Sequence, residues 1–533
     1  MKPESDLGSH EVTNQPPPRG DRDLWQEDPV LRTHAAGADV GGLARKLGSL
    51  EAAGWGREAN RRLPELRLFD AGGRRLDEVV FSDAYHRLMT LGLEAGYASG
   101  PWTGGSHLTH AATVYLMSQV EPGSCCPMTM TYAAVPALQA AAPSLAEVWV
   151  PKLTAAAYDP AVAPLSAKRA ATLGMAMTEK QGGSDVRSNA TRAEREGEAW
   201  RLMGHKWFCS APMSDGFLTL ARTEAGVSCF LVPRWLEDGT RNAVRLQRLK
   251  DKLGNRANAS AEIEYHGARA HLVGEEGRGI PAIMAMVHHT RLDTGLAPAG
   301  LMRAALDHLS HWVLHRTAFQ RRLADQPLMR ALLADLVLDW EGATALGFHV
   351  ARAFDDPARA PFARIAVALA KYVNNKLAPR VVVEAMEGLG GMGYVEDTPL
   401  PMLYREAPLN GIWEGSGNVI CLDILRTLAR EPEAGGQLAA ELDAAIGADR
   451  RYDAALEAHR ARWPRAPREA EARWFAERLA LLLAASVLLR HAPAAVAEAF
   501  VATRLAGDRG QVAGSIAPAD AAPILARLGP GFR

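Results

Sequence analysis

The spacing of apolar residues along the chain changes twice. From about residue 31 to residue 175, apolar residues recur three and four positions apart, with breaks at Gly100-Pro101 and Glu121-Pro122-Gly123. This spacing predicts helices. Between residues 176 and 275 the apolar runs are short or alternating, which predicts strands. The helical spacing returns from 276 to about 430. The order predicts a mostly α-helical protein with an inserted β-domain.

Individual elements follow from these patterns. The predicted strands are Leu173–Thr178, Ala199–Phe208, Phe217–Arg222, Val227–Val232 and Ala261–Tyr265. The predicted helices of the second helical region are Arg303–Ala318, Leu328–Asp355, Pro361–Gly388 and Cys421–Ala429. These four helices suggest a four-helix bundle.

The two ends of the chain differ from the middle. Residues 1–30 contain three consecutive prolines, many charges and few apolar side chains, so we expect an arm that cannot bury itself. Trp25 offers that arm one anchor on a partner subunit. Residues 434–533 read as an additional helical domain whose basic residues are all arginine.

Composition narrows the class of protein. A chain of 533 residues is too long for one core. Its net charge of −1 gives no overall attraction to nucleic acid. Five cysteines without a C-x-x-C pair argue for a reducing compartment and against a metal or disulfide framework. No apolar run reaches the ~18 residues of a membrane span, and no hydrophobic signal core is visible at the N-terminus. We therefore expect a cytoplasmic protein.

One carboxylate stands out. In Y-R-E-A-P-L-N-G-I-W-E-G-S-G-N, Glu414 lies between Trp413 and the turn Gly415-Ser416-Gly417. An aromatic neighbour partly desolvates a carboxylate, which raises its pKa and makes it a better base. The glycines let a ligand approach the backbone. A solvated glutamate before a glycine turn has the same spacing, so the residues alone leave both interpretations open.

Other segments carry weaker signals. M-T-E-K-Q-G-G-S-D-V at Met177–Val186 can point N–H groups and hydroxyls at an anion or a polar ring, yet it also fits an ordinary turn. K-W-F-C-S at Lys206–Ser210 reads as a strand, along which Trp207 and Phe208 should point in opposite directions. Arg316 fits a helix-end charge. Arg291 fits either a substrate contact or an intramolecular ion pair.

Together these motifs resemble the acyl-CoA dehydrogenase family, over about Pro101–Leu428. The resemblance implies that Glu414 removes the α-proton of an acyl thioester while FAD accepts the β-hydride. It places Thr178 at the pyrimidine edge of the flavin and Ser210 near its N5. It implies that Arg316-Thr-Ala-Phe319 reaches the FAD diphosphate of a neighbouring subunit, although Gln320 replaces the usual glycine.

The FAD contacts implied by the resemblance come from several segments. They are Met177, Thr178, Gly183, Ser184, Phe208, Ser210, Arg316, Phe319, Gln326, Glu387, Gly390, Gly391, Trp413, Gly415, Ser416, Gly417 and Asn418. Glu387 replaces the frequent glutamine, so we expect it to accept hydrogen bonds from ribose hydroxyls. Arg291 aligns with an arginine near the active-site helix and is the candidate substrate contact.

Within the family, R-L-K-D-K-L-G-N-R at Arg248–Arg256 and the C-terminal extension resemble the AidB subfamily of alkylation-response flavoproteins. This resemblance implies a homotetramer, weak isovaleryl-CoA dehydrogenase activity and binding to double-stranded DNA. Three hypotheses remain: a dehydrogenase, a DNA-binding protective flavoprotein with residual activity, and a helical scaffold that holds FAD without chemistry. Retention of Glu414, Ser416 and Asn418 argues against the third. The acyl chain and the electron acceptor stay open.

A DNA-binding face would have to be local. Residues 434–533 hold 13 Arg against 11 Asp and Glu, a net charge of +2. The stretch 459–478 holds six Arg against three Glu, a net of +3. The candidate phosphate contacts are Arg450, Arg451, Arg460, Arg462, Arg465 and Arg468. A charge-mixed helix face packed on the core would look similar.

Overall fold

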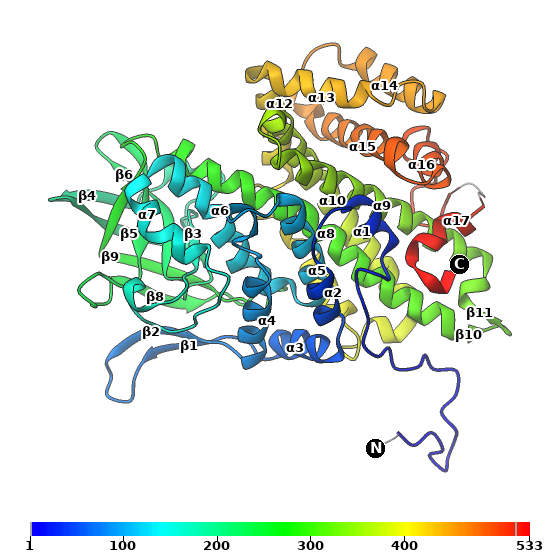
Figure 1. Ribbon diagram of the computed structural model, residues 1–533, viewed down its shortest axis with the longest axis horizontal. Helices are drawn as coiled ribbons and strands as arrows, with labels where there is room; N and C mark the ends of the chain where they lie inside the picture. The colour runs from blue at the N-terminus through cyan, green and yellow to red at the C-terminus, as the bar shows by residue number, and fades with distance from the viewer. Residues whose placement is uncertain (1–2, 517–519, 533) are drawn as a thin grey trace.

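The computed structural model describes residues 3–516 and 520–532. Figure 1 shows a β-domain at one end, long helices through the middle and the C-terminal helices stacked against one side of these helices. This arrangement confirms the prediction of a mostly α-helical protein with an inserted β-domain.

The N-terminal region is mainly helical. Its helices are α1 (Pro29–His34), α2 (Gly41–Leu47), α3 (Leu50–Arg61), α4 (Asp83–Glu94), α5 (His107–Val120), α6 (Cys125–Ala141) and α7 (Pro143–Leu153). Ser49, Ser82 and Ser106 cap α3, α4 and α5 by accepting hydrogen bonds from backbone N–H groups of the first turn. Almost every residue of α5 and α6 is buried, because other elements surround them.

The expectation of helix throughout this region is wrong for one hairpin. β1 (Glu65–Phe69) and β2 (Arg75–Val80) pair antiparallel around the turn that follows Asp70. The hairpin packs on the β-domain, where the Asp77 carboxylate accepts a hydrogen bond of 2.9 Å from the Leu246 N–H. Residues of E-L-R-L-F and R-L-D-E-V-V alternate in exposure, a period of two within a helical context.

The β-domain is a seven-stranded sheet that closes on itself. Its strands are β3 (Leu173–Ala176), β4 (Arg192–Glu196), β5 (Ala199–Ser210), β6 (Gly216–Thr223), β7 (Gly226–Pro233), β8 (Val244–Leu249) and β9 (Ser260–Val273). The order is β3-β6-β4-β5-β9-β7, with β8 on β9, and β6 also pairs with β7. The sequence pattern indicated neither β4 nor β8, because Arg-Ala-Glu-Arg-Glu contains no typical β-formers and Val-Arg-Leu-Gln-Arg-Leu contains one.

Long helices form the second helical region. They are α8 (Gly279–His315), α9 (Pro327–Phe354) and α10 (Ala360–Gly388), followed by α11 (Leu400–Glu406) and α12 (Gly417–Arg430). The predicted start of α8 at Arg303 is 24 residues too late. Gly295, Pro298 and Gly300 lower helix propensity there, yet the two glycines are needed for packing. A Cβ at Gly300 would lie 2.5 Å from the Tyr115 carbonyl oxygen.

The C-terminal extension is also helical. Its helices are α13 (Pro432–Asp443), α14 (Arg450–Arg462), α15 (Ala472–His491), α16 (Ala494–Phe500) and α17 (Ala522–Leu525). Buried ion pairs join it to α9: Arg504 lies 2.7 Å from both Asp335 and Asp339, and Arg527 lies 2.7 Å from Glu341. Removing one partner of such a pair is costly, so the extension is an integral part of the fold.

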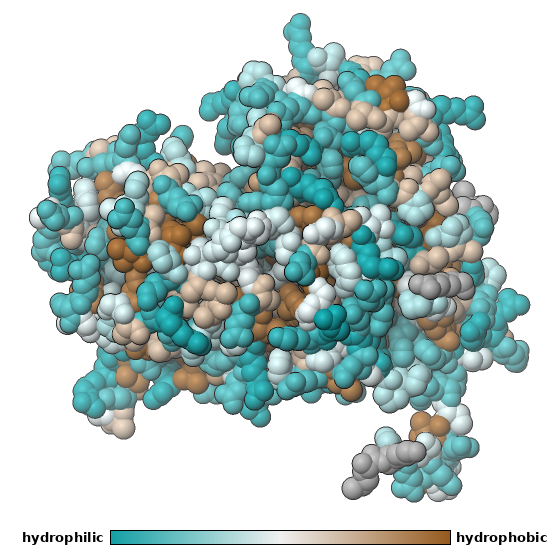
Figure 2. Space-filling view, in the orientation of Figure 1, coloured by the Kyte–Doolittle hydropathy of each residue, from teal (hydrophilic) through white to brown (hydrophobic). Residues whose placement is uncertain are grey.

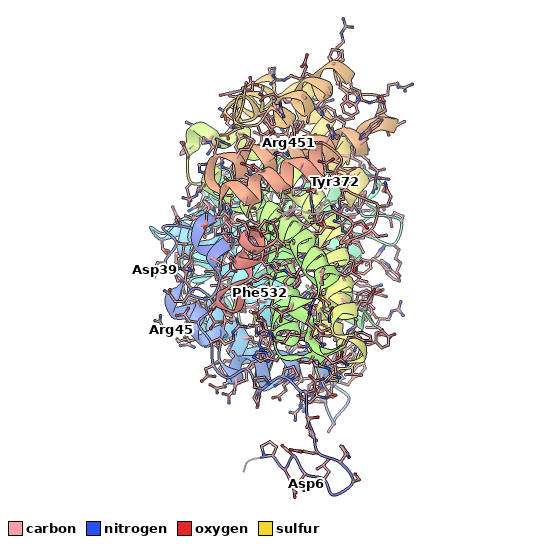
Figure 3. All side chains as sticks on the ribbon, turned by 90° about the vertical axis from the view of Figure 1, so that its right-hand side faces the viewer. Asp6, Asp39, Arg45, Tyr372, Arg451 and Phe532 are labelled. Carbon is pink, nitrogen blue, oxygen red and sulfur yellow. The ribbon has the colours of Figure 1, made fainter. Side chains whose placement is uncertain are left out.

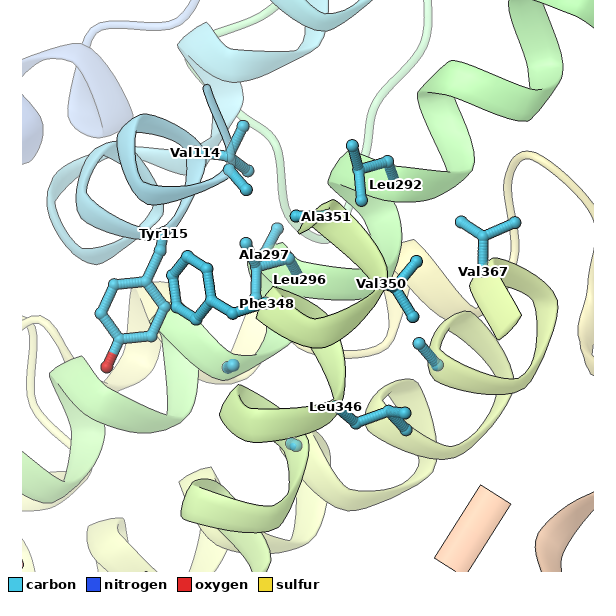
Figure 4. Close-up of a cluster of buried hydrophobic side chains, with 14 of the residues drawn as sticks. Val114, Tyr115, Leu292, Leu296, Ala297, Leu346, Phe348, Val350, Ala351 and Val367 are labelled. Atoms are coloured by element: carbon cyan, nitrogen blue, oxygen red, sulfur yellow. The ribbon is translucent and has the colours of Figure 1, made fainter. Parts of the chain in front are cut away.

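One continuous apolar core links the helical regions. Figure 4 shows Tyr115 of α5 beside Phe348 of α9 and Leu296 of α8, with Val367 of α10 at the opposite edge of the same cluster. A second cluster fills the β-domain around Trp200 and Phe230.

No residue of the N-terminal arm between 3 and 27 is buried, yet part of the arm is held on the body of the protein. Residues 14–28 lie along α8, where Arg19 and Arg22 pair with the partly buried Asp307, and Trp25 is partly buried on its own chain. Residues 3–13 stand away from the body, as Asp6 in Figure 3 and the separate lobe of atoms in Figure 2 show. Arg19 and Arg22, two of the charges that predicted an exposed arm, therefore hold it to α8.

Three further features bear on the class of protein. Within residues 3–516 and 520–532, no helix is both long enough and apolar enough to cross a membrane. The same residues contain no cluster of His, Cys, Asp and Glu suited to a metal ion. All five cysteines are buried free thiols.

Candidate active site

Glu414 stands in a strained turn just before α12. Its φ is 57°, in the left-handed region that residues other than glycine seldom occupy. Lys371 on α10 fixes the turn by donating hydrogen bonds to the carbonyl oxygens of Asn410 at 2.8 Å and Gly415 at 3.0 Å. The Trp413 indole donates to the Asn410 side chain at 2.6 Å. Strain of this kind persists where the surroundings over-determine a functional geometry.

The Glu414 carboxylate lies in a largely desolvated position. Burial raises its pKa above the ordinary value, while Thr290 and the charges of Lys371 and Arg291 lower it in part. The Thr290 hydroxyl donates to Glu414 Oε2 at 2.6 Å. A raised pKa and one fixed hydrogen bond suit a base that must accept a proton in a set direction.

Arg291 holds the turn that contains Glu414 against α12. Its guanidinium donates to the Glu414 carbonyl oxygen at 3.2 Å and forms a buried ion pair of 2.7 Å with Asp423 of α12. Arg364 shares Asp423 at 2.9 Å. Of the two interpretations left open for Arg291, the structure therefore contains the intramolecular ion pair.

Replacing Thr290 by valine should move the acid limb of kcat/KM to higher pH. A carboxylate can act as a base only when deprotonated. The hydrogen bond that the Glu414 carboxylate would lose is worth ~1.5–3 kcal/mol, so the pKa should rise by about one unit or more. The rate should fall at low pH and recover at high pH, as measured over a series of buffers. Thr294→Val is the matched control, because the Thr294 hydroxyl bonds only backbone carbonyls. An unshifted limb in Thr290→Val would contradict this role.

The Met177–Val186 loop follows β3 and surrounds a buried carboxylate that the sequence interpretation missed. Glu179 accepts hydrogen bonds from the Lys206 ammonium at 2.8 Å, the Ala190 N–H at 2.6 Å and the Thr191 N–H at 3.2 Å. A Cβ at Gly183 would lie 2.6 Å from Thr178 Oγ1. Only glycine therefore lets the two limbs of the loop approach this closely.

Glu179 and Lys206 are wholly buried side chains. Burial alone would raise the pKa of Glu179, but Lys206 and the N–H donors bring it down to about 2. Burial lowers the pKa of Lys206 to about 8 against the attraction of Glu179. Both residues lie inside the quoted motifs. Lys206 stands before β-formers in its motif, whereas the residues around Glu179 carry no comparable signal.

The end of β5 carries the two rings predicted to diverge. Lys250 Nζ lies 3.3 Å from the centre of the Trp207 ring and 4.6 Å from that of Phe208, so both rings approach one ammonium. The expected opposite orientation is wrong, because the pairing of β5 with β9 shifts register between Lys206 and Cys209. Phe208 keeps 47% of its surface exposed.

Ser210 connects the end of β5 to Lys252, a partly buried lysine. Its hydroxyl lies 3.2 Å from that of Ser260, and Lys252 donates to Ser260 Oγ at 3.1 Å. Burial raises the pKa of the neighbouring Cys126 thiol to about 12, with Lys252 lowering it and Glu414 raising it. The thiol therefore lies within electrostatic reach of both Lys252 and the candidate base, which brings Ser210 and Glu414 to one region.

The remaining predicted cofactor residues lie at the other end of the bundle. Arg316 and Phe319 follow α8, whose rise from Thr290 to its end is about 38 Å. Glu387, Gly390 and Gly391 end α10 nearby, since a Cβ at Gly388 would touch Leu309 of α8. Figure 1 shows the corresponding hairpin, β10 (Thr317–Ala318) and β11 (Arg321–Arg322), far from the β-domain. One chain therefore does not bring the two groups together.

The hairpin tip keeps a glycine-like backbone without glycine. Phe319 and Gln320 have φ of 52° and 57°, and Phe319 is 91% exposed. The Gln326 side chain donates to the Ala318 carbonyl oxygen at 3.1 Å. Gln320 therefore occupies a left-handed backbone conformation that glycine would adopt without strain.

The C-terminal extension also reaches the base-bearing motif. Arg473 of α15 donates a hydrogen bond of 2.9 Å to the Asn418 side chain, in the first turn of α12. The sequence interpretation grouped Arg473 only with the positive stretch. No sequence signal marked this contact.

Most of the candidate DNA contacts carry carboxylate partners. Arg451 pairs with Asp449 at 2.6 Å and Arg460 with Asp443 at 2.5 Å. Glu471 takes both Arg462 at 3.0 Å and Arg468 at 3.4 Å. Arg450 and Arg465 are exposed. These pairs reduce the positive charge that the stretch presents to solvent.

Comparison with known proteins identifies the class to which this fold and site belong. Residues 174–268 match the middle domain and residues 277–429 the C-terminal domain of acyl-CoA dehydrogenases. The chain belongs to the acyl-CoA dehydrogenase family of FAD-dependent oxidoreductases. Residues 14–160 match the N-terminal domain of the adaptive response protein AidB, which places the chain in the AidB branch.

Individual relatives agree with this assignment. The chain is 43% identical over 507 residues to the putative acyl-CoA dehydrogenase AidB of Escherichia coli strain K12, covering 92% of this chain and 94% of that one. It is 32% identical to acyl-CoA dehydrogenase family member 11 of Caenorhabditis elegans, covering 77% of this chain and 69% of that one. The crystal structure of C. elegans ACDH-11 with C11-CoA superposes on this structure with a TM-score of 0.83. The sequence identity is 27%, and the match covers 97% of this chain and 95% of that one. The predicted family, fold class, enzyme class and FAD cofactor are confirmed.

Proposed function

We propose that the protein dehydrogenates a short or branched acyl-CoA, similar to isovaleryl-CoA, between the α and β carbons, with Glu414 as the base. The observation that carries this proposal is the geometry of Glu414: a partly buried carboxylate in a strained turn, fixed by Thr290 and Lys371. The third hypothesis, a scaffold without chemistry, gives no reason for that strain.

The residues around the turn fit a flavin. Phe208 offers a half-exposed aromatic face, Thr178 and Ser210 offer hydroxyls, and Gly183 keeps the loop narrow. Met177, Ser184 and the segment Trp413–Asn418 complete this end of the site. FAD, when bound there, accepts the hydride from the β carbon.

The chain's own groups supply the other half of the reaction. Glu414 takes the α-proton onto its carboxylate as the Cα–Hα electron pair becomes the new double bond. Thr290 orients the acceptor oxygen, and Lys371 holds the carbonyl groups on either side of Glu414. Arg291 keeps α12 in register through Asp423, so we assign it to positioning rather than to the substrate.

The acyl chain is best determined by a turnover screen. ACDH-11 was crystallised with C11-CoA, so the series runs from isovaleryl-CoA to an eleven-carbon acyl-CoA, with flavin bleaching as the signal. The proposal expects the highest kcat/KM at the short or branched end. A maximum at eleven carbons would replace that part of the proposal and leave Glu414 in place.

We further propose that two subunits share each FAD, within a homotetramer. Arg316, Phe319, Gln326, Glu387, Gly390 and Gly391 would come from the neighbour of the chain that supplies Glu414. The support is the separation of these groups within one chain, which a dinucleotide does not span. Arginine suits the diphosphate because its planar fork binds two oxygens at once.

Replacing Arg316 by alanine should weaken FAD binding about tenfold or more and reduce assembly. One bidentate phosphate contact is lost, and charge-assisted bonds are the strong ones. Gel filtration with light scattering and absorbance at the flavin band measures both quantities. Arg322→Ala is the control, since Arg322 lies in the same hairpin and pairs with Asp325. A fully flavinylated monomer would contradict the shared site.

Binding to double-stranded DNA is the second candidate function, with dehydrogenation then residual or absent. It is favoured by exposed arginines along α14 and the segment after it, of which Arg468 keeps 86% of its side chain exposed. The ion pairs that most of these arginines make argue for the alternative of a charge-mixed surface. An acyl-CoA screen beside a duplex titration on one preparation separates the two functions.

Neutralising Arg460, Arg462, Arg465 and Arg468 to glutamine should flatten the salt dependence of duplex binding. Each phosphate contact removed lowers the log–log slope by ~0.9, while FAD content should not change. Fluorescence anisotropy across a salt series measures the slope. Unchanged binding would remove this face from consideration, and no binding by the parent protein at low salt would reject the DNA role.

A further inference from the structure

The N-terminal arm lies along the last part of α8, and Asn14 of the arm contacts the β10–β11 hairpin. The Asn14 side chain donates to the Thr317 carbonyl oxygen at 2.8 Å and accepts from the Thr317 N–H at 2.8 Å. Arg316 donates to the Asn14 carbonyl oxygen at 2.7 Å. Asn14 thus closes the hairpin as a neighbouring strand would, on both groups of one residue.

The arm is anchored again further along α8. The Pro17 carbonyl oxygen lies 2.8 Å from His311 Nε2, and Arg19 and Arg22 pair with Asp307. Burial alone would raise the pKa of Asp307, but these arginines and Arg303 hold it well below the ordinary value. The anchor therefore stays ionised across the physiological range.

The spacing of these contacts matches two regular structures. Three consecutive prolines, Pro16 to Pro18, favour polyproline II, which rises ~3.1 Å per residue and leaves no N–H unsatisfied at proline. A polyproline II segment from Arg19 to Pro17 is about 6 Å long. The rise of α8 from Asp307 to His311, the residues that they contact, is also about 6 Å. The stiff arm therefore carries Asn14 to a fixed place beside Arg316.

We propose that Asn14 is a positioning residue for cofactor binding: through the proline spacer it fixes the direction of Arg316 and of the Phe319 tip. This inference rests on the proposed sharing of FAD between subunits. Phe319 is almost fully exposed, and its turn has two residues other than glycine at positive φ. Such a turn needs outside support to keep one conformation, and Asn14 supplies it through its bonds to Thr317.

Asn14→Gly is the sharpest variant. Asn14 has a φ of 57°, which glycine adopts freely, so the substitution removes the side-chain bonds without backbone strain. Gln15→Gly is the matched control, because it makes the arm equally flexible one residue later. FAD affinity of the reconstituted apoprotein, from flavin fluorescence, is measured beside the apoprotein's melting temperature.

Asn14→Gly should raise the Kd for FAD about fivefold, the effect of about one lost hydrogen bond, at an unchanged melting temperature. Gln15→Gly should behave as the parent. Asn14→Gly combined with Arg316→Ala should lose less affinity than the sum of the two single losses, because part of the effect of Asn14 passes through Arg316. Parental affinity in Asn14→Gly, or additive losses in the double variant, would overturn the inference.

The same experiment separates the inference from the proposal beneath it. If Arg316→Ala weakens FAD binding while Asn14→Gly does not, only the role of Asn14 is overturned. If Arg316→Ala itself binds FAD as the parent does, the shared site is overturned, and the role of Asn14 with it.

Discussion

Replacing Glu414 by glutamine should abolish flavin bleaching by acyl-CoA while FAD remains bound. Glutamine keeps the size of the side chain and still accepts the Thr290 hydrogen bond, but it cannot take up the α-proton. Positioned general bases contribute ~10²–10⁴-fold to a rate, so we expect a loss of about a thousandfold or more. Stopped-flow absorbance at the flavin band, with the best substrate of the acyl-CoA series, measures it.

The matched control for this variant is Glu406→Gln. Glu406 is a second buried carboxylate whose pKa is raised by burial. It accepts hydrogen bonds from the Asn255 backbone and side chain, and a glutamine oxygen can take over the bond from the backbone N–H. Rapid bleaching should survive in Glu406→Gln. Bleaching retained in Glu414→Gln, or lost equally in both variants, would reject Glu414 as the specific base.

The sequence predicts secondary structure best where one period runs for many residues. The starts and ends of α9 and α10 differ from the predicted helices by one residue or none, because their apolar positions repeat over seven or more turns. The β1–β2 hairpin and β4 were not predicted, because each is short and rich in charged residues. The early part of α8 was not predicted, because its glycines are required by packing against other elements. A single sequence does not show that packing.

In the candidate site, too, local features could be predicted and long-range contacts could not. Glu414 and the Met177–Val186 loop could be singled out because the residues that define them are contiguous. The interactions that set their properties are not contiguous. Thr290 lies 124 residues from Glu414, and Asp423 lies 132 residues from Arg291. The long-range anchors Lys371, Lys252, Arg473 and Asn14 were therefore beyond the reach of motif spacing.

Replacing Lys206 by methionine should destabilise the protein by about 3–5 kcal/mol. Lys206 and Glu179 are wholly buried, so the variant would leave a carboxylate in the β-domain without its compensating charge. The Glu179 carboxyl would then be driven towards its protonated form, which weakens the hydrogen bonds from the Ala190 and Thr191 N–H groups that shape the Met177–Val186 flavin loop. Urea unfolding followed by circular dichroism gives the change in free energy, and FAD content reports on the loop.

The pair must be tested as a pair. Replacing both partners, as Lys206→Met with Glu179→Gln, removes the uncompensated charge, and glutamine can still accept the N–H bonds. Losing one member of a buried pair costs more than replacing both, so the double variant should recover much of the stability and FAD content lost in Lys206→Met. Glu264→Gln is the control for a carboxylate of the same sheet, because Glu264 is partly exposed on β9 and pairs only with His266. If Lys206→Met were as stable as the parent, or the double variant weaker than Lys206→Met, the flavin loop would not depend on this pair.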